Sequence, residues 1–241
     1  MAINVNTVYK TVLLILNQQQ RGYMTPDEFN KVATQVQLNI FEKYLDDLNQ
    51  QYRVPQNDTE YANRVKNTEE NLQFFQKYIN NASVAGAITG TNPFTIDTTV
   101  VTDLYRLGSV IYKGETLTQY AQRNEITQLL LSPLTQPTTN FPIYLYEEGK
   151  LYIYPTTITT ADDINISYLK VPADVYWNYG VGSLGQFEYN SGTSVDFELN
   201  ISEQSNVIMR VLAYAGVIIN DPTIIQVAQQ EVQLEEQNSK Q

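Results

Sequence analysis

The chain of 241 residues contains no cysteine and no histidine. These absences exclude disulfide bonds, thiol nucleophiles, metal sites built from cysteine or histidine, and any mechanism that uses imidazole as a general base. The sequence also has no Asp-x-Asp-x-Asp-Gly calcium loop. We therefore predict no catalytic residue, no cofactor and no metal, and expect a protein that is not an enzyme.

Charged residues are also scarce, at 17% of the chain, and they are mostly acidic, with 15 Lys and Arg against 26 Asp and Glu. A net charge of −11 argues against a surface that binds DNA, RNA or anionic lipid, because such surfaces need clustered basic residues. The longest apolar stretch, residues 207–219, contains Arg210 and is too short to span a bilayer. The first residues do not have the pattern of a signal peptide. We expect no membrane anchoring.

Two patterns that could indicate an active or binding site have simpler interpretations. A glycosidase needs two carboxyl groups that face each other across a cleft, whereas neighbouring residues on a helix diverge by about 100°. The match to Gly-x-Gly-x-x-Gly at residues 180–185 is not followed by the helix that pyrophosphate binding requires. We interpret the match as a loop and the adjacent acidic pairs as solvated surface. The pairs are Asp46-Asp47, Glu69-Glu70, Glu147-Glu148, Asp162-Asp163 and Glu235-Glu236.

Helical periodicity dominates both ends of the chain. Apolar residues recur at helical spacing from Val5 to Leu16, and Thr25-Pro26-Asp27-Glu28 predicts a capped start for a second helix. A third helix is expected over 59–80, and further helices after residue 201. The middle of the chain has the short alternating runs of strands, among them 94–96 and 104–112, and a short helix is expected near 119–131.

The order of helices, strands and helices predicts an α+β protein. We expect the N- and C-terminal helices to form one helical bundle, with an antiparallel β-rich domain of sandwich or barrel type inserted between them. The predicted parts are residues 1–82 as the first part of the bundle, 83–200 as the inserted domain, and 201–241 as the helices that complete the bundle.

Tyrosine and aliphatic residues alternate in the segments 143–146 and 151–154, which predicts a β-hairpin. If residues 147–149 form a three-residue loop with Gly149 in the left-handed position, Leu145 faces Leu151 and Tyr144 faces Tyr152. All aliphatic residues would then lie on one face and all tyrosines on the other, whereas a two-residue loop would mix them. The tyrosine face is either the outer face of an ordinary sandwich or a protein interface. The candidate interface residues are Tyr144, Tyr146, Tyr152, Tyr154 and, as a core residue or an interface residue, Trp177.

Three segments together resemble the head-to-tail connector (adaptor or ring) proteins of short-tailed, crAss-like bacteriophages. Residues 8–48, VYKTVLLILNQQQRGYMTPDEFNKVATQVQLNIFEKYLDDL, are similar to the helix pair that opens many virion proteins of this type. PIYLYEEGKLYIYP at 142–155, followed by INISYLKVPADVYW at 164–177, resembles their core of hairpin, Tyr-Pro, strand, Pro and Trp. FELNISEQSNVIMRVLAYAGVIINDP at 197–222 resembles their closing helix after a strand.

This resemblance implies a structural virion protein without catalytic residues. Such proteins form a homo-oligomeric ring, commonly twelve-fold, that stacks below the portal protein or on other tail ring proteins. DNA passes through the channel only as cargo, with the helical bundle near the channel and the β domains outward. The protein would assemble in the host cytoplasm and reside in the virion. The sequence differs from those adaptors that insert a long C-terminal tail into the portal, so its position in the tail stays open.

Two alternatives remain at this stage. A tail-hub or baseplate protein would be structural as well, and sequence does not separate it from a ring near the portal. A carbohydrate-binding or carbohydrate-hydrolysing surface module would use exposed aromatic rings to stack on sugars. Aromatic placement discriminates between the classes, because a glycan site gathers rings in a groove, whereas an interface spreads them along a rim.

Overall fold

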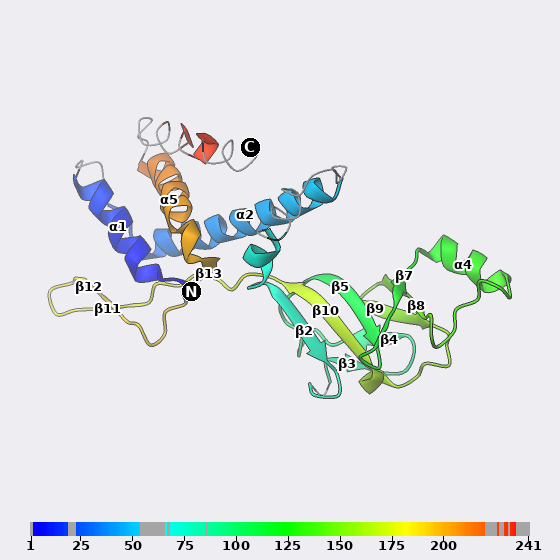
Figure 1. Ribbon diagram of the computed structural model, residues 1–241. Helices are drawn as coiled ribbons and strands as arrows, with labels where there is room; N and C mark the ends of the chain where they lie inside the picture. Colours follow the sequence, from blue (N-terminus) through cyan, green and yellow to red (C-terminus); the bar gives the residue numbers. More distant parts are fainter. Residues whose placement is uncertain are drawn as a thin grey trace. The chain divides into compact units, whose positions relative to one another are not determined.

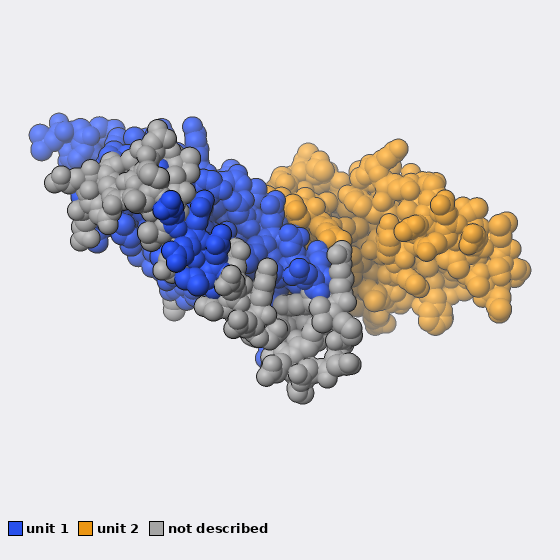
Figure 2. All heavy atoms as spheres, turned by 90° about the horizontal axis from the view of Figure 1, so that it is seen from above, with its two compact units in different colours: residues 1–74, 172–241 blue, residues 75–171 orange. Residues whose placement is uncertain are grey.

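The computed structural model describes residues 2–18, 23–53, 66, 68–84, 86–219, 226, 229–230 and 232–234. The chain divides into two compact units, shown in different colours in Figure 2. Unit 1 consists of residues 1–74 and 172–241, and unit 2 of residues 75–171. Both ends of the chain therefore belong to one unit, and the other unit is inserted between them.

Unit 1 is mainly helical. Its long helices are α1 (Val5–Gln18), α2 (Pro26–Arg53) and α5 (Gln204–Ile219), and α5 packs against both α1 and α2 (Figure 1). The expected apolar faces are buried: Val8 and Val12 of α1, and Val207 of α5, are fully shielded from solvent. The α+β class is confirmed: the N-terminal helices pack with C-terminal α5, and the β-rich part is inserted between them in the sequence.

The start of α2 has the predicted capping box. The Thr25 backbone N–H and hydroxyl donate to the Glu28 carboxylate at 2.9 and 2.8 Å, and the Glu28 N–H donates back to the Thr25 hydroxyl at 3.4 Å. These hydrogen bonds, the backbone bond first, hold the pKa of the Glu28 carboxyl below its usual value. Pro26 is the first helical residue, where the missing N–H costs no hydrogen bond.

Two small sheets complete unit 1. Strand β1 (Ala2–Ile3) pairs antiparallel with β13 (Phe197–Asn200), which leads through the 3-10 turn Ile201–Glu203 into α5. Strands β11 (Tyr179–Val181) and β12 (Phe187–Tyr189) form an antiparallel hairpin. The Gly-x-Gly-x-x-Gly match thus lies in the end of β11 and the turn of this hairpin, with no helix following it.

Unit 2 contains two sheets. The first has the order β2 (Gln76–Asn80), β10 (Ile164–Lys170), β5 (Leu104–Tyr112) and β6 (Thr116–Leu117). The second has the order β3 (Ile88–Thr89), β4 (Phe94–Ile96), β9 (Lys150–Tyr154), β8 (Ile143–Glu147) and β7 (Gln119–Tyr120). All pairings are antiparallel except that of β7 with β8. Helix α4 (Arg123–Leu131) follows β7, and the 3-10 turn Ala161–Asp163 precedes β10.

The core of unit 2 takes side chains from both sheets. Val110, Ile164 and Ile166 come from the first sheet, and Phe94 and Leu151 from the second; all are fully buried. The two sheets therefore share one apolar layer, the arrangement that the predicted sandwich or barrel requires. The strands expected at 94–96 and 104–112 have the predicted limits as β4 and β5.

One predicted helix is partly a strand. Residues 68–72 are helical, but residues 73–75 form a turn and Gln76–Asn80 forms β2, so the helix expected over 59–80 is wrong from residue 73 onward. Ile79 packs into the unit 2 core and pairs with Ile166 of β10. The segment forms a strand because it pairs with the backbone of β10, and the local sequence pattern does not indicate this distant partner. Most of residues 59–67 and 220–241, where other helix predictions fall, lies outside the described residues.

The unit limits also differ from the predicted domain limits. Residues 75–82, expected in the bundle, belong to unit 2, while residues 172–200, expected in the inserted domain, belong to unit 1. The reason is packing: β2 joins a sheet of unit 2, and residues 173–177 bind helix α2 of unit 1. The short helix near 119–131 begins at Arg123, because Gln119 and Tyr120 form β7.

Candidate assembly surfaces

The β8–β9 hairpin does not have the predicted register. Its loop is the two-residue Glu148-Gly149, and both residues have positive φ, 54° and 72°, as a type I′ turn requires. Tyr144 therefore pairs with Ile153, and Leu145 with Tyr152. The expected pairs Leu145–Leu151 and Tyr144–Tyr152 are wrong by one residue.

This shift mixes the two faces of the hairpin. Tyr144 and Tyr146 share a face with Leu151 and Ile153, and this face packs into the core between the sheets. Tyr152 and Tyr154 share the opposite face with Ile143 and Leu145, where helix α4 covers them through a second apolar cluster. The all-tyrosine face predicted from sequence does not exist.

The four hairpin tyrosines consequently have different surroundings. Tyr144 is only 7% exposed, its hydroxyl donates to the Gly108 carbonyl at 3.2 Å, and burial raises its pKa. Tyr146, Tyr152 and Tyr154 are half-buried. On the outer face, Arg123 of α4 lies 5.8 Å from the Tyr152 ring centroid and binds the Glu147 carboxylate through two nitrogens. These residues fasten α4 to the sheet.

Trp177 lies inside unit 1 and is 4% exposed. The Tyr179 and Tyr189 rings of the β11–β12 hairpin both stack on it at 5.7 Å between centroids, and the Tyr9 ring of α1 contacts it at 4.5 Å. The indole N–H donates to the Asn6 side chain at 3.2 Å. Aromatic rings of the chain itself therefore cover Trp177. This packing does not leave the open stacking platform that a glycan site needs.

A polar row on α2 holds the segment before the hairpin. The Asn30 side chain accepts from the Trp177 N–H at 2.8 Å and donates to the Trp177 carbonyl at 3.3 Å. Thr34 makes the same two bonds with Val175 at 3.1 and 3.4 Å. Gln37 donates to the Ala173 carbonyl at 2.7 Å and accepts from the Glu198 N–H at 2.8 Å. Side chains on one face of α2 thus make the hydrogen bonds with the backbone of residues 173–177 that a neighbouring strand would otherwise make.

Sequence reasoning did not find this polar row. Its signal is the spacing of Asn30, Thr34 and Gln37, which places three hydrogen-bonding side chains on one helix face. Asn30 and Gln37 are 8% and 1% exposed, so their partners had to come from elsewhere in the fold. The partners are backbone groups about 140 residues away along the chain, and no local pattern identifies them.

The β11–β12 hairpin carries exposed apolar residues at its tip. Leu184 is 91% exposed, Val181 69% and Phe187 40%. We call these three residues the hairpin tip. The segment 178–192 contains one charged residue, Glu188. The hairpin extends from the base of α1 in Figure 1, so unit 1 has a nearly uncharged, apolar surface at this point.

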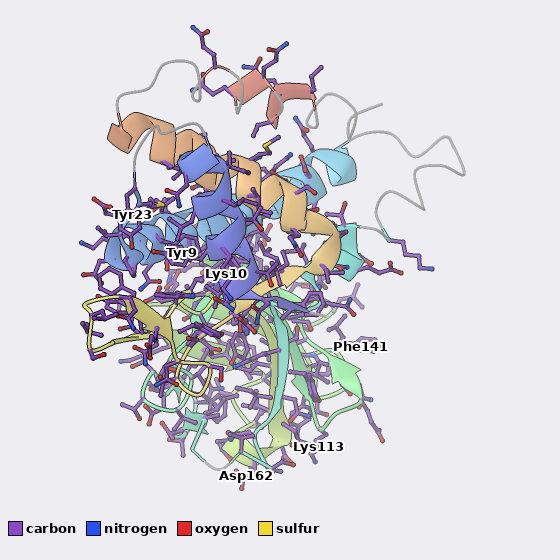
Figure 3. All side chains as sticks on the ribbon, turned by 90° about the vertical axis from the view of Figure 1, so that its left-hand side faces the viewer. Tyr9, Lys10, Tyr23, Lys113, Phe141 and Asp162 are labelled. Atoms are coloured by element: carbon purple, nitrogen blue, oxygen red, sulfur yellow. The ribbon has the colours of Figure 1, made fainter. Side chains whose placement is uncertain are left out.

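A second exposed apolar surface lies on the connection from α4 to β8 in unit 2. Leu131 is 79% exposed, Leu134 94% and Phe141 79%. Figure 3 shows Phe141 at the edge of the molecule. We call these three residues the α4–β8 surface. Residues 132–142 contain no charged residue and three prolines, Pro133, Pro137 and Pro142, which restrict the backbone.

Charge is distributed unevenly between the units. Unit 1 has nine Lys and Arg against 18 Asp and Glu, a net charge of −9. Unit 2 has six Lys and Arg against eight Asp and Glu, a net charge of −2. The acidic excess of the chain therefore belongs almost entirely to the helical unit.

Three side chains of unit 2, Lys77, Asp103 and Tyr168, form a hydrogen-bonded group in which the pKa values of Asp103 and Tyr168 are shifted. The Asp103 carboxylate accepts from Lys77 Nζ at 2.5 Å and from the Tyr168 hydroxyl at 3.0 Å. Burial raises the pKa of Asp103, but the bonds from Lys77 and Tyr168 outweigh it and hold the pKa below its usual value. Burial and the bond to Asp103 raise the pKa of Tyr168 to about 12. The group joins β2 and β10 to the segment before β5, a structural role.

Two observations on the described residues concern possible metal and ligand sites. The described residues contain no cluster of three or more acidic side chains that could hold a metal ion. A pocket of about 370 Å³ in unit 1, next to α2 and α5, is lined by described residues that include no carboxylate: Asn39, Arg210, Ala213, Tyr214, Gln229, Val232 and Gln233. None of the helices in the described part of the chain is long and apolar enough to cross a membrane.

No protein-family model matches the chain, and no curated protein matches it either.

Proposed function

We propose that the protein is a structural component of a virion, a ring or adaptor of the head-to-tail connector of a short-tailed phage. The observation that carries this proposal is the presence of two separate exposed apolar surfaces, one on each unit, in segments that are almost free of charge. A ring needs a heterologous contact that closes by rotation, so each subunit must offer two different surfaces. The hairpin tip and the α4–β8 surface supply two such surfaces.

The charge distribution supports the same proposal. A channel through which DNA slides must not hold phosphates, and carboxylates repel them. The excess of acidic residues in the helical unit fits a location of that unit near the channel, with the β-rich unit outward. The portal protein and other tail rings would be the neighbours in the stack, and the virion the location.

The described residues favour a structural role over glycan binding. Trp177 is covered by Tyr9, Tyr179 and Tyr189. The most exposed large apolar residues among those described are Leu134, Leu184, Leu131, Phe141 and Val181. Leucine side chains do not stack on sugars, but they lose little on desolvation in a protein contact. A tail-hub or baseplate location would use the same surfaces.

The test is the oligomeric state of the purified full-length chain. Native mass spectrometry should give one discrete multiple of 27.5 kDa, and negative-stain microscopy should show closed rings with a central channel. Because the proposed contacts contain few charges, the rings should persist in salt that screens ion pairs. A chain that remains monomeric over a wide range of concentration, or that turns over glycans, would contradict the proposal.

A further inference from the structure

We propose that the pocket next to α2 and α5 in unit 1 binds a small hydroxy acid, whose carboxylate is held by Arg210 and Tyr214. The pocket has a volume of about 370 Å³, and small-molecule sites in proteins have volumes of about 300–1,000 Å³. This inference goes beyond the proposed ring and does not depend on it, because the described lining belongs entirely to unit 1 of one chain.

Three segments of unit 1 line the pocket: helix α2, helix α5 and the helical residues 229–230 and 232–234. Arg210 is followed by lining residues three and four positions later, and so is Gln229. Each group therefore lies on one face of its helix. The described lining contains three amides, one hydroxyl, one guanidinium and two apolar side chains.

The charge of the pocket is opposite to that of its unit. Unit 1 has nine Lys and Arg against 18 Asp and Glu, yet the only charged side chain in the described lining is Arg210. An anion in the pocket meets a guanidinium and no carboxylate of the described lining, so it is attracted. The planar guanidinium also matches a carboxylate through two parallel hydrogen bonds, which an ammonium group does not make.

A hydrogen-bonded chain along α5 orients Arg210. Its Nε donates to Asn206 Oδ1 at 2.7 Å, and Asn206 Nδ2 donates to Glu203 Oε2 at 2.9 Å. Asn206 is only 5% exposed, so a buried group fixes the plane of the guanidinium. Nε carries one of the five N–H donors, and the terminal nitrogens carry the other four. A carboxylate in the pocket adds to these contacts at the terminal nitrogens of a preorganised group.

A second chain, which starts on α2, orients Tyr214. Gln35 Nε2 donates to Asn39 Oδ1 at 2.9 Å, and Asn39 Nδ2 donates to the Tyr214 hydroxyl at 3.0 Å. The Tyr214 oxygen is the acceptor in that bond, so its own proton serves another acceptor. Arg210 and Tyr214 are four residues apart on one face of α5, with about 5–6 Å between Cβ atoms at this spacing. One carboxylate can therefore accept from both side chains.

The rest of the lining fits a hydroxylated carbon skeleton. The amides of Gln229 and Gln233 each offer donors and an acceptor, which suits hydroxyl groups. Ala213 and Val232 offer apolar contacts to carbon atoms. A bare inorganic anion would use Arg210 and Tyr214 but none of these four side chains. The lining thus favours an organic acid with hydroxyl groups.

Isothermal titration calorimetry of the full-length protein at low salt tests the site with three probes. Gluconate has a carboxylate and hydroxyl groups, sorbitol has an alcohol in place of the carboxylate, and inorganic phosphate is a bare anion. Gluconate should bind once per chain, and sorbitol and phosphate should bind more weakly by about tenfold or more. If gluconate does not bind, or if either other probe binds as tightly, the assigned ligand class is wrong.

Full-length variants locate the binding, and circular dichroism checks that each one is folded. Tyr214→Phe removes one hydroxyl from a side chain that is 38% exposed, and it should weaken gluconate binding by about tenfold, the effect of one hydrogen bond to a charged group. Arg210→Gln should weaken binding further. Arg210→Lys keeps the charge but not the planar donors, so its affinity should lie between those of Arg210→Gln and wild type.

The matched control is Arg106→Gln, which makes the same change of charge on β5 in unit 2 and should leave binding unchanged. If Tyr214→Phe binds gluconate as wild type does, or if Arg106→Gln weakens binding as much as Arg210→Gln, the pocket is not the binding site. The oligomeric state of the wild type is measured separately and decides the proposed ring, whatever the titrations give.

Discussion

Tyr144 lies directly opposite Ile153 in the β8–β9 hairpin, and both side chains enter the core between the two sheets of unit 2. The other face of the hairpin pairs Leu145 with Tyr152 beneath helix α4. Each face therefore has both tyrosine and aliphatic residues. The hairpin thus separates two apolar clusters, one on each of its faces. The most exposed apolar residues lie elsewhere, on the β11–β12 tip and on the end of α4 and the α4–β8 connection.

Replacing the hairpin tyrosines one at a time should separate their roles. Tyr144→Ser should lower the free energy of unfolding by about 3 kcal/mol or more, because it leaves a cavity in the core. Tyr144→Phe should cost about 1 kcal/mol, the value of its hydroxyl bond to Gly108. Tyr152→Ser, at a half-buried position, should cost clearly less than Tyr144→Ser. Urea unfolding followed by circular dichroism measures these values, and equal costs for Tyr144→Ser and Tyr152→Ser would contradict the observed register.

The two-residue turn of this hairpin can be tested at Glu148. Its φ of 54° is in the left-handed region, which asparagine tolerates better than glutamate. Glu148→Asn should therefore raise the free energy of unfolding by about 0.5 kcal/mol, whereas Gly149→Ala should lower it by about 1 kcal/mol. In a three-residue loop only Gly149 would need this conformation. A neutral or destabilising result for Glu148→Asn in thermal unfolding would favour that alternative loop.

The capping box at Thr25 should contribute measurably to the stability of unit 1. Thr25→Ala removes the acceptor for the Glu28 N–H and one donor to the Glu28 carboxylate, so we expect a loss of about 1 kcal/mol. The matched control is Thr11→Ala on α1, where the threonine hydroxyl only bonds back to the Thr7 carbonyl within the helix. That change should be neutral within about 0.5 kcal/mol. Equal effects in denaturant titrations would mean that the cap does not stabilise α2.

The polar row on α2 predicts a large effect for a single amide. Asn30→Ala leaves the buried N–H and carbonyl of Trp177 without partners, and we expect a loss of about 2–3 kcal/mol. Trp177 is the only tryptophan, so its fluorescence reports directly on this segment and should shift to longer wavelength as water enters. Gln35→Ala on an exposed face of the same helix is the control and should leave both the spectrum and stability unchanged.

The Lys77–Asp103–Tyr168 group predicts how the stability of unit 2 depends on pH. The pKa of Asp103 is lowered in the fold, so its contribution is present above the unfolded pKa of about 4 and is lost as pH falls below it. The pKa of Tyr168 is raised to about 12, so its contribution is present below about pH 10 and is lost as pH rises through 12. Asp103→Asn should flatten the acid limb of the urea midpoint against pH and lower the pKa of Tyr168.

The control for that pH profile is Tyr168→Phe. This variant should lose part of the alkaline limb and keep most of the acid limb, since the Lys77–Asp103 ion pair remains. An acid limb unchanged in Asp103→Asn would show that other carboxyl groups determine the acid sensitivity of unit 2.

Local signals in the sequence determined several parts of this protein correctly. The α+β class, the apolar faces of α1 and α5, the capped start of α2, and the limits of β4 and β5 all followed from periodicity and capping residues. These features depend on residues within a few positions of one another. Helical and strand periods, caps and prolines act over that range, so one segment contains the necessary information.

Only the tertiary structure decided the features that depend on distant partners. A shift of one residue in the β8–β9 register moved two tyrosines into the core, and both loop lengths were compatible with the sequence. Segment 76–80 became a strand because β10 supplies hydrogen bonds, and Asn30 found its partner at Trp177, far along the chain. Burial and hydrogen bonding between remote segments outweigh local propensity, and the same tertiary packing left Leu184 and Leu134 exposed.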